Sequence, residues 1–232
     1  TGQGVVGIDR GVAVTAMTSD GQKFQAPKAK KQQARYEKLQ RVLNTKTKGS
    51  NNRKKLLDKM ADTRFGAGNQ RKDWLEKTTT TLAESYEVVV LEDLRVKDMT
   101  KRAAPKQDEQ GKYLPNGQSA KRGLNRAILG SAWGGLKTRL EDKTTVVLCS
   151  AAYTSQRCSS CGHTEPENRK TQAEFACLAC GHSENADLNA AKNIQRAGLN
   201  LLEQGPREDV ALSLNEGLRP EGQGLPLATV FK

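Results

Sequence analysis

The sequence predicts an α/β fold, a mixed sheet flanked by helices, with a small four-cysteine module inserted into it. The chain opens with short apolar segments separated by turn signals, and after residue 28 the apolar positions recur with helical spacing. Towards the C-terminal end, two Cys-x-x-Cys pairs indicate a separate module. A length of 232 residues is enough for one hydrophobic core and one such module.

The first strands are predicted from apolar runs and turn residues. Residues 4–9 are apolar and predict a strand that ends at Asp9. Residues 12–18 predict a second strand, and Asp20-Gly21 is a strong signal for a hairpin turn into a third strand at 22–26.

The rest of the chain alternates helices and strands. We predict helices at 30–47 and 52–85, a strand at 86–92, a polar loop at 99–119, a helix at 123–141, a strand at 144–149 and a helix at about 187–202. Gly66 and Gly68 weaken the case for an unbroken second helix. The tail 203–232 contains glycines, prolines and a slight acidic excess, and we expect it to be disordered.

Two cysteine pairs predict a zinc ribbon. Cys158-Ser-Ser-Cys161 and Cys177-Leu-Ala-Cys180 are each followed by Gly-His, and fifteen residues separate Cys161 from Cys177. Four thiolates complete a tetrahedral zinc shell and leave no open position, so the site would be structural. The alternative, a redox dithiol, would need only one of the two pairs.

Two histidines and a fifth cysteine lie outside the two cysteine pairs. His163 and His182 could be ligands, but four cysteines suffice, which favours surface or supporting roles. The fifth cysteine, Cys149, ends an apolar strand, and we expect it to be a buried core thiol.

Three acidic residues are candidates for a magnesium site. Asp9 and Glu92 each end an apolar strand, and Asp187 opens the last predicted helix. If the two strands are neighbours, the acids meet at one edge of the sheet, where carboxylates can hold two Mg²⁺ (or Mn²⁺) ions for phosphodiester hydrolysis. Because side chains alternate along a strand, Asp93 should point away from Glu92. The alternatives are a turn residue, a strand-end charge and a helix N-cap, and sequence spacing alone does not decide between them.

Positive charge is concentrated in one segment. The net charge is +12, and residues 28–59 contain twelve Lys or Arg against two acidic residues. This bias favours contact with nucleic-acid phosphates beside the acidic residues over a merely solvated helix face. The contacts we predict are Lys46, Lys48, Arg53, Lys54 and Lys55. No apolar run approaches the ~18 residues of a membrane span, so no membrane partner is expected.

Five motifs occur in order along the chain: Gly7-Ile-Asp9-Arg-Gly11, Gly68-Asn-Gln-Arg-Lys-Asp-Trp74, Val90-Leu-Glu92-Asp-Leu94, Tyr153-Thr-Ser-Gln-Arg-Cys158-Ser-Ser-Cys161-Gly162 and Asn185-Ala-Asp187-Leu-Asn-Ala-Ala-Lys-Asn-Ile194. Together they resemble the nuclease half of TnpB, the RNA-guided protein of insertion sequences, and equally the compact type V CRISPR effectors descended from it. The resemblance runs from about Gly4 to Ile194.

The resemblance implies an RNase H-like fold of the RuvC type. The nuclease core would comprise residues 1–154, with a basic helical insertion at 28–85, and residues 185–202. The zinc ribbon at 155–184 would belong to the target-nucleic-acid-binding insertion. Asp9, Glu92 and Asp187 would be the catalytic acids, and the partners would be a guide RNA and a target DNA. Wedge and recognition domains are expected upstream of residue 1 or on another chain, and we expect the protein in the prokaryotic cytoplasm, associated with the nucleoid.

The implied function is RNA-guided, Mg-dependent endonucleolytic cleavage of DNA. One alternative is an RNA-guided repressor that binds without cutting, which the presence of all three acids disfavours. Another is an RNase H-like transposase, which the ribbon and the motif around Asp187 disfavour. TnpB and type V effectors are not separated by this sequence, because they differ in genomic context and in their N-terminal domains.

Overall fold

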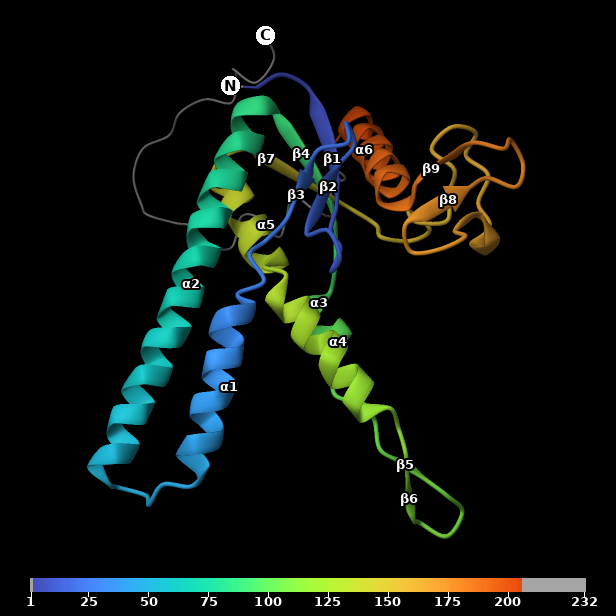
Figure 1. The fold of residues 1–232 in the computed structure, drawn as a ribbon. Helices are drawn as coiled ribbons and strands as arrows, with labels where there is room; N and C mark the ends of the chain where they lie inside the picture. Colours follow the sequence, from blue (N-terminus) through green and yellow to red (C-terminus); the bar gives the residue numbers. More distant parts are fainter. Residues whose placement is uncertain (1, 206–232) are drawn as a thin grey trace, which may run out of the picture.

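The computed structural model, which describes residues 2–205, contains a five-stranded mixed sheet (Figure 1). Its strand order is β3-β2-β1-β4-β7. The bounds are Val5–Asp9 for β1, Ala16–Thr18 for β2, Lys23–Phe24 for β3, Val88–Glu92 for β4 and Thr145–Cys149 for β7. The first three strands are antiparallel neighbours, whereas β4 runs parallel to β1 and β7 parallel to β4. The predicted mixed sheet flanked by helices is therefore confirmed.

The parallel strands bring two predicted site residues to one edge. In the register of β1 with β4, Ile8 lies opposite Leu91. The residues that follow, Asp9 and Glu92, are consequently neighbours at the carboxyl ends of adjacent strands. Glu92 also lies opposite Cys149 of β7, which is buried, as the sequence predicted.

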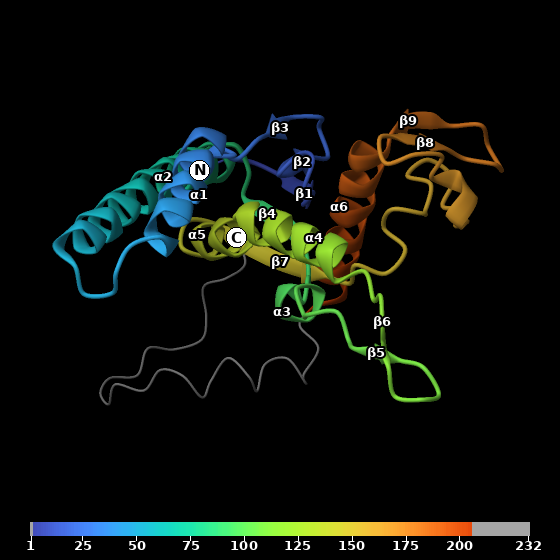
Figure 2. The same ribbon diagram turned by 60° about the horizontal axis from the view of Figure 1, so that its bottom comes forward.

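Helices cover both faces of the sheet. On one face, α2 (Asn51–Ser85) and α5 (Trp133–Glu141) pack on the strands. On the other face lies α6 (Ala186–Gln204), and Figure 2 shows the sheet between the two groups of helices. The core on the α2–α5 side consists of Val6, Ile8, Ala16, Leu82, Val89, Leu91, Leu136 and Leu140. The core on the α6 side consists of Val90, Cys149 and Ile194, with Val5, Val147 and Ala197 packed against it.

Glycines allow α6 to lie very close to the strands. A Cβ atom on Gly7 of β1 would lie 2.2 Å from the backbone oxygen of Ala191 in α6. A Cβ atom on Gly198 of α6 would lie 2.3 Å from a methyl group of Val90. Any side chain at these positions would displace the helix, so both glycines fix the height of α6 above the sheet.

Two long projections extend from this body. One is the hairpin of α1 (Lys30–Asn44) and α2, and the other is α4 (Gln118–Gly130) with the small β5–β6 hairpin beyond it (Figure 1). Ser50 caps α2 by accepting a hydrogen bond from the Arg53 amide, and the helix continues through Gly66 and Gly68 without a break. None of the helices between residues 2 and 205 combines the length and the apolar character that a membrane crossing requires.

Two predicted segments were wrong in detail. The single helix predicted at 123–141 is two helices, because Ala132 adopts a left-handed conformation with φ 63° between them. Trp133, which follows the break, is buried, and its indole N–H donates to the carbonyl of Gly11, in the segment after β1, at 3.2 Å. The predicted loop 99–119 contains the antiparallel strands β5 (Lys106–Gln107) and β6 (Tyr113–Leu114), and the short α3 (Val96–Met99) precedes it.

The four-cysteine module and α6 form the C-terminal end of the described chain. The four-cysteine module contains a 3-10 turn (Pro166–Asn168) and the antiparallel pair β8 (Glu174–Ala176) and β9 (Ser183–Asn185). α6 then continues to Gln204, two residues beyond the predicted end of the helix. The remainder of the predicted disordered tail, 206–232, lies outside the described residues.

Candidate metal centres

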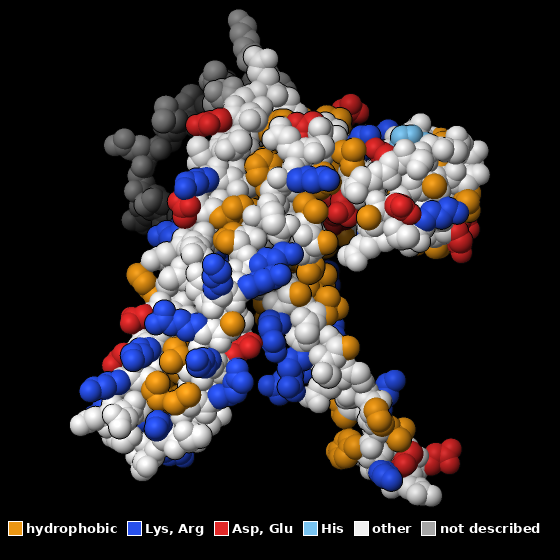
Figure 3. All heavy atoms as spheres, viewed as in Figure 1, with side chains coloured by type: hydrophobic (Ala, Val, Ile, Leu, Met, Phe, Trp, Pro, Cys, Tyr) orange, Lys and Arg blue, Asp and Glu red, His pale blue; other side chains and the backbone are white. Residues whose placement is uncertain are grey.

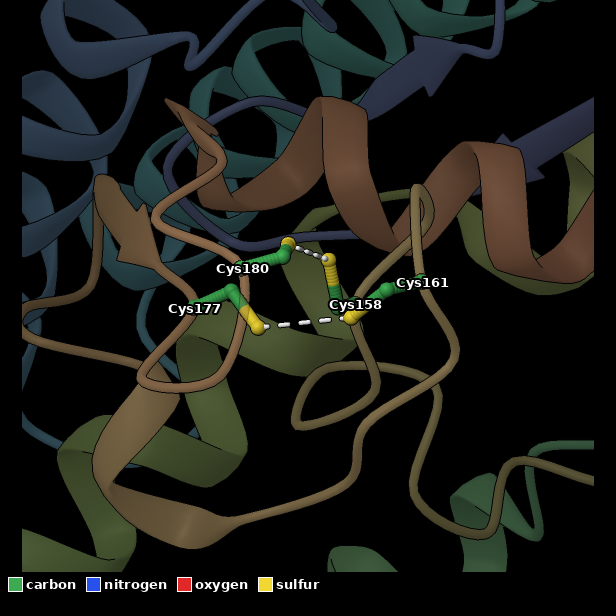
Figure 4. A group of neighbouring side chains, drawn as sticks. All are labelled: Cys158, Cys161, Cys177 and Cys180. Atoms are coloured by element: carbon green, nitrogen blue, oxygen red, sulfur yellow. Dashed lines mark hydrogen bonds between the residues drawn. The ribbon is translucent and has the colours of Figure 1, made fainter.

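The four predicted zinc ligands form one cluster (Figure 4). The Sγ atoms of Cys158 and Cys180 are 3.8 Å apart, and those of Cys161 and Cys177 are 3.6 Å apart. Four thiolates at ~2.3 Å from a central zinc ion would lie about 3.8 Å from one another. The cluster is therefore close enough to bind one metal ion, and its dimensions are consistent with zinc.

Each cysteine pair sits in the same kind of turn. The amide of Gly162 donates to the Cys158 carbonyl, and the amide of Gly181 donates to the Cys177 carbonyl, both at 3.0 Å. Both glycines have a positive φ, of 81° and 72°, which is why glycine follows each pair. Burial opposes ionisation of Cys177, but the backbone amides of Cys180 and Ala179 and the neighbouring thiols outweigh it and lower its pKa to about 6. Hydrogen bonds from the same neighbouring thiols raise the pKa of Cys180 to about 12, so the thiols of the cluster do not ionise independently.

The two histidines lie outside this cluster. Nε2 of His182 is 2.9 Å from a carboxylate oxygen of Glu184, and Nε2 of His163 is 3.9 Å from Glu165. Among residues 2–205, the group of metal-binding side chains that lie within 4.8 Å of one another consists of the four cysteines alone. The supporting role favoured for the histidines fits these contacts.

The three predicted acids lie on the α6 side of the sheet. Val5 packs into the α6-side core and Gly7 lies against α6, so Asp9, which has the same parity in β1, faces that side as well. By the same alternation, Val90 places Glu92 of β4 on this face. The third acid, Asp187, lies in the first turn of α6.

The charges of the other two acids act on Asp9. Burial, followed by the negative charges of Glu92 and Asp187, raises the pKa of Asp9 to about 7. Burial also raises the pKa of Glu92 and of Asp187, although a hydrogen bond from Thr154 and the charge of Arg10 oppose this at Glu92. A divalent cation would relieve this repulsion, since it favours the ionised carboxylates. The carboxylate oxygens of the three acids do not all lie within 4.8 Å of one another, whereas the sulfur atoms of the four cysteines do.

The N-cap of α6 is Asn185 and not Asp187. The side-chain oxygen of Asn185 accepts hydrogen bonds from the amides of Asp187 and Leu188, at 3.1 and 3.2 Å. Asn185 is therefore the N-cap, and the alternative that Asp187 caps the helix was wrong.

Sequence reasoning missed three residues that surround the acids. Thr154 donates a 2.6 Å hydrogen bond to the Glu92 carboxylate, and the buried Arg10 guanidinium donates to the Glu92 backbone carbonyl. Arg169, from the segment between the two cysteine pairs, lies 3.7 Å from the Asp187 carboxylate. Arg10 and Thr154 occur within the quoted motifs and could have been found there, whereas no sequence signal pointed to Arg169.

Hydrogen bonds join the cysteine module to α6 and to the acids. Asn189 of α6 accepts from the Ser159 amide at 2.8 Å and donates to the Arg157 carbonyl at 2.8 Å. Asn193 donates to the carbonyls of Thr154 and Arg157, at 2.9 and 2.6 Å. Since Thr154 also holds Glu92, the position of this acid depends on the segment that leads into the first cysteine pair.

The predicted basic contacts lie away from the acids. Lys46 and Lys48 are in the turn between α1 and α2, and Lys54 and Lys55 are in the first turns of α2. Figure 1 shows this turn at the far end of the hairpin from the sheet, so these residues are not beside the acidic edge. Arg53 donates to the Leu43 carbonyl at 2.9 Å and thus closes the turn.

Two family models match the sequence. Residues 1–103 match the OrfB_IS605 family, described as "Probable transposase", and residues 133–194 match the "Cas12f1-like, TNB domain". Together with the relatives below, these matches show that the chain is similar to TnpB-like nucleases.

The relatives carry nuclease names. The chain is 40% identical over 200 residues to the "Putative RNA-guided DNA endonuclease InsQ" of Escherichia coli (strain K12), a match that covers 84% of this chain and 49% of that protein. It is 33% identical over 223 residues to a "Putative RNA-guided DNA endonuclease" of Streptomyces pristinaespiralis, covering 93% of this chain and 48% of that protein. The chain thus spans about half the length of these relatives.

One solved structure to which the chain is similar is the "Cryo-EM structure of the Cas12f1-sgRNA-target DNA complex". The match has a TM-score of 0.45 at 21% identity and covers 82% of this chain and 49% of that one.

Proposed function

We propose that the chain is the nuclease portion of an RNA-guided DNA endonuclease, with Asp9, Glu92 and Asp187 as its catalytic acids. The observation that carries the proposal is the convergence of these acids on the α6 face, where each of the other two raises the pKa of Asp9. Perturbed carboxylates gathered at a sheet edge are typical of catalytic sites. The names of the relatives support the same activity.

We also propose that the sheet is an RNase H-like sheet of the RuvC type. Its antiparallel β1-β2-β3 meander followed by parallel β4 and β7, with acids at the ends of β1 and β4, supports this assignment. The core would comprise residues 1–154 and 185–202, and the ribbon residues 155–184. The ribbon would be the target-nucleic-acid-binding insertion, and its four cysteines would hold a structural zinc ion.

Mg²⁺ or Mn²⁺ bound by the three acids would supply an activated water and charge stabilisation at the phosphate. The chain's own residues prepare that site. Thr154 fixes the Glu92 carboxylate, and Arg10 fixes the backbone at the end of β4. Arg169, beside Asp187, places a positive charge where a phosphate oxygen could be held.

The proposed partners are a guide RNA and a target DNA, which the relatives' names support, and the proposed location is the prokaryotic nucleoid. Specificity would come from base pairing with the guide, and affinity from phosphate contacts. A repressor that binds without cutting is the second candidate, and a transposase the third.

The fate of the DNA distinguishes these candidates. The protein is prepared at the full length of its relatives, together with the RNA that copurifies with it. It is incubated in Mg²⁺ with plasmids that carry or lack the sequence complementary to this guide RNA. We expect the matched plasmid to be cut and to keep free ends. A matched plasmid that is bound but stays supercoiled would favour the repressor, and ends joined to new DNA would favour the transposase.

A further inference from the structure

One face of α6 binds the backbone of the segment 154–159, which runs into the first cysteine pair. The side chains involved recur at positions i, i+4 and i+7 of the helix, and they are Asn189, Asn193 and Arg196. Their hydrogen bonds, of 2.6 to 2.9 Å, are to backbone groups of Thr154, Arg157 and Ser159. Figure 3 shows the cysteine module packed against the body of the molecule, with acidic side chains where the two meet. The helix thus sets the position of this segment.

Asn193 contributes two hydrogen-bond donors to this arrangement. Its side chain is buried, and its Nδ2 donates to the carbonyls of Thr154 and Arg157, at 2.9 and 2.6 Å. Its Oδ1 is also buried and has no hydrogen-bond partner within residues 2–205. A buried acceptor without a partner opposes folding, so the two donated hydrogen bonds must at least offset this effect. The position is therefore defined by a pair of N–H donors directed at two carbonyl oxygens.

Thr154 connects this anchor to the carboxylate of Glu92. Its backbone carbonyl is bound by Asn193, and its hydroxyl donates to a Glu92 carboxylate oxygen at 2.6 Å. Both Thr154 and Glu92 are buried. The preceding residue, Tyr153, has a left-handed backbone with φ 63°, and its carbonyl accepts from two amides of the turn that follows, at 3.0 and 2.9 Å. A bulky residue keeps this conformation only where its surroundings fix it. The place of the Thr154 hydroxyl is consequently determined from both sides.

We infer that Asn193 is a positioning residue for the proposed nuclease reaction, because it fixes the Thr154 hydroxyl and, through it, the Glu92 carboxylate that would bind the metal ion. The inference rests on the proposed function, in which Glu92 is a metal ligand. Within residues 2–205, no side chain other than Thr154 donates a hydrogen bond to this carboxylate. Residues that orient a metal ligand in this way typically change metal affinity or activity by about 10–100-fold when they are replaced.

The alternative is that Asn193 only docks the cysteine module on α6, and Asn189 is the matched control for it. Asn189 is also buried in α6 and also makes two hydrogen bonds to the segment, to the Arg157 carbonyl and the Ser159 amide. It makes no hydrogen bond to residue 154. A role in docking alone therefore predicts similar effects of Asn189→Ala and Asn193→Ala, whereas positioning of Glu92 predicts different ones.

The experiment measures plasmid cutting as a function of Mg²⁺ concentration, with the guide-loaded protein at the full length of its relatives. The variants are Asn193→Ala, Asn193→Ser, Asn189→Ala, Thr154→Val, Thr154→Ser and the double variant Asn193→Ala, Thr154→Val. Neither short side chain at position 193 can reach both carbonyls, so either variant serves if the other fails to fold. Thr154→Val keeps the shape of the side chain without its hydroxyl, and Thr154→Ser keeps the hydroxyl. Zinc content, measured for each variant, shows that the module is folded.

Thr154→Val and the Asn193 variants should each raise the half-saturating Mg²⁺ concentration by about 10–100-fold while one zinc ion per chain is retained. Thr154→Ser and Asn189→Ala should stay within a few-fold of the parent. The double variant should be no weaker than Thr154→Val, because both changes break the same chain of contacts. A smaller fraction of folded protein would lower the rate at every Mg²⁺ concentration without moving the half-saturating concentration.

An equal rise for Asn189→Ala and Asn193→Ala, or multiplied effects in the double variant, would overturn the inference. Hydrogen exchange without metal tests it separately from the proposed function. The amides of residues 156 and 157 should exchange at least about fivefold faster in Asn193→Ala than in the parent, which corresponds to one lost hydrogen bond of ordinary strength. Unchanged exchange there would refute the inference whether or not the parent cuts DNA. A parent that cuts in no divalent cation, but whose Asn193→Ala variant shows the faster exchange, would count against the proposed function alone.

Discussion

Asp9→Asn is expected to abolish DNA cutting while leaving DNA binding intact. The substitution keeps the shape of the side chain but removes the charge that would place a metal ion. The loss should be at least about 10³-fold in rate, since roughly 4 kcal/mol of transition-state stabilisation disappears with the metal. Glu92→Gln and Asp187→Asn should behave in the same way. Cutting is measured as the first-order rate of plasmid linearisation in Mg²⁺ with guide RNA bound.

Asp93→Asn is the matched control for this set. Asp93 follows Glu92 directly but is exposed. Because side chains alternate along a strand, it should point to the opposite face from Glu92. The rate of DNA cutting by Asp93→Asn should stay within a few-fold of the rate of the parent protein. Robust cutting by Asp187→Asn, or an equal loss in Asp93→Asn, would contradict the assignment of the acids.

Cys177→Ser should release the bound zinc and unfold the cysteine module. Metal binding supplies about 10–16 kcal/mol of folding free energy in comparable small zinc modules, far more than so small a core supplies. The core of the module consists of Cys158, Phe175, Cys177 and Ala186, two of which are ligands themselves. The zinc content, measured by elemental analysis, should fall from one per chain to none.

The loss of zinc should also disturb the positions of Glu92 and Asp187. Unfolding would release Thr154 from Glu92 and Arg169 from Asp187, so cutting should fall together with zinc content. Cys149→Ala is the control, because Cys149 is buried in the α6-side core, away from the cluster. One zinc per chain retained in Cys177→Ser would refute the four-cysteine site.

The sequence pattern predicted those features of the two metal centres that depend on residues close together in the chain. The cysteine spacing determined the cluster, because each pair closes its own turn with the glycine that follows it. The apolar runs that end in Asp9 and Glu92 predicted two strands, and β1 and β4 proved to be neighbours. Only that pairing, which sequence spacing does not contain, made the two acids adjacent.

Features set by tertiary contacts could not be read from the sequence. Ala132 interrupts the predicted helix, and Trp133, which follows it, donates a hydrogen bond to Gly11, which lies 122 positions away in the chain. Arg169 approaches Asp187 only because the module folds back on α6. The charge-rich segment predicted a nucleic-acid contact, but the hairpin geometry placed its densest charges at the far turn.

The most direct test of the account is a Mn²⁺ titration of the zinc-loaded chain, followed by electron paramagnetic resonance and by proton release. Because the pKa of Asp9 is raised to about 7, its carboxyl group is mostly protonated at about pH 6 and mostly ionised at about pH 8. Metal binding favours the ionised form, so the affinity should rise by up to about tenfold per pH unit below 7 and level off above it, with proton release on the acid side only. The double variant Asp9→Asn, Asp187→Asn should lose this binding, whereas Asp93→Asn should retain it. Equal Mn²⁺ binding by the parent and the double variant would contradict the account.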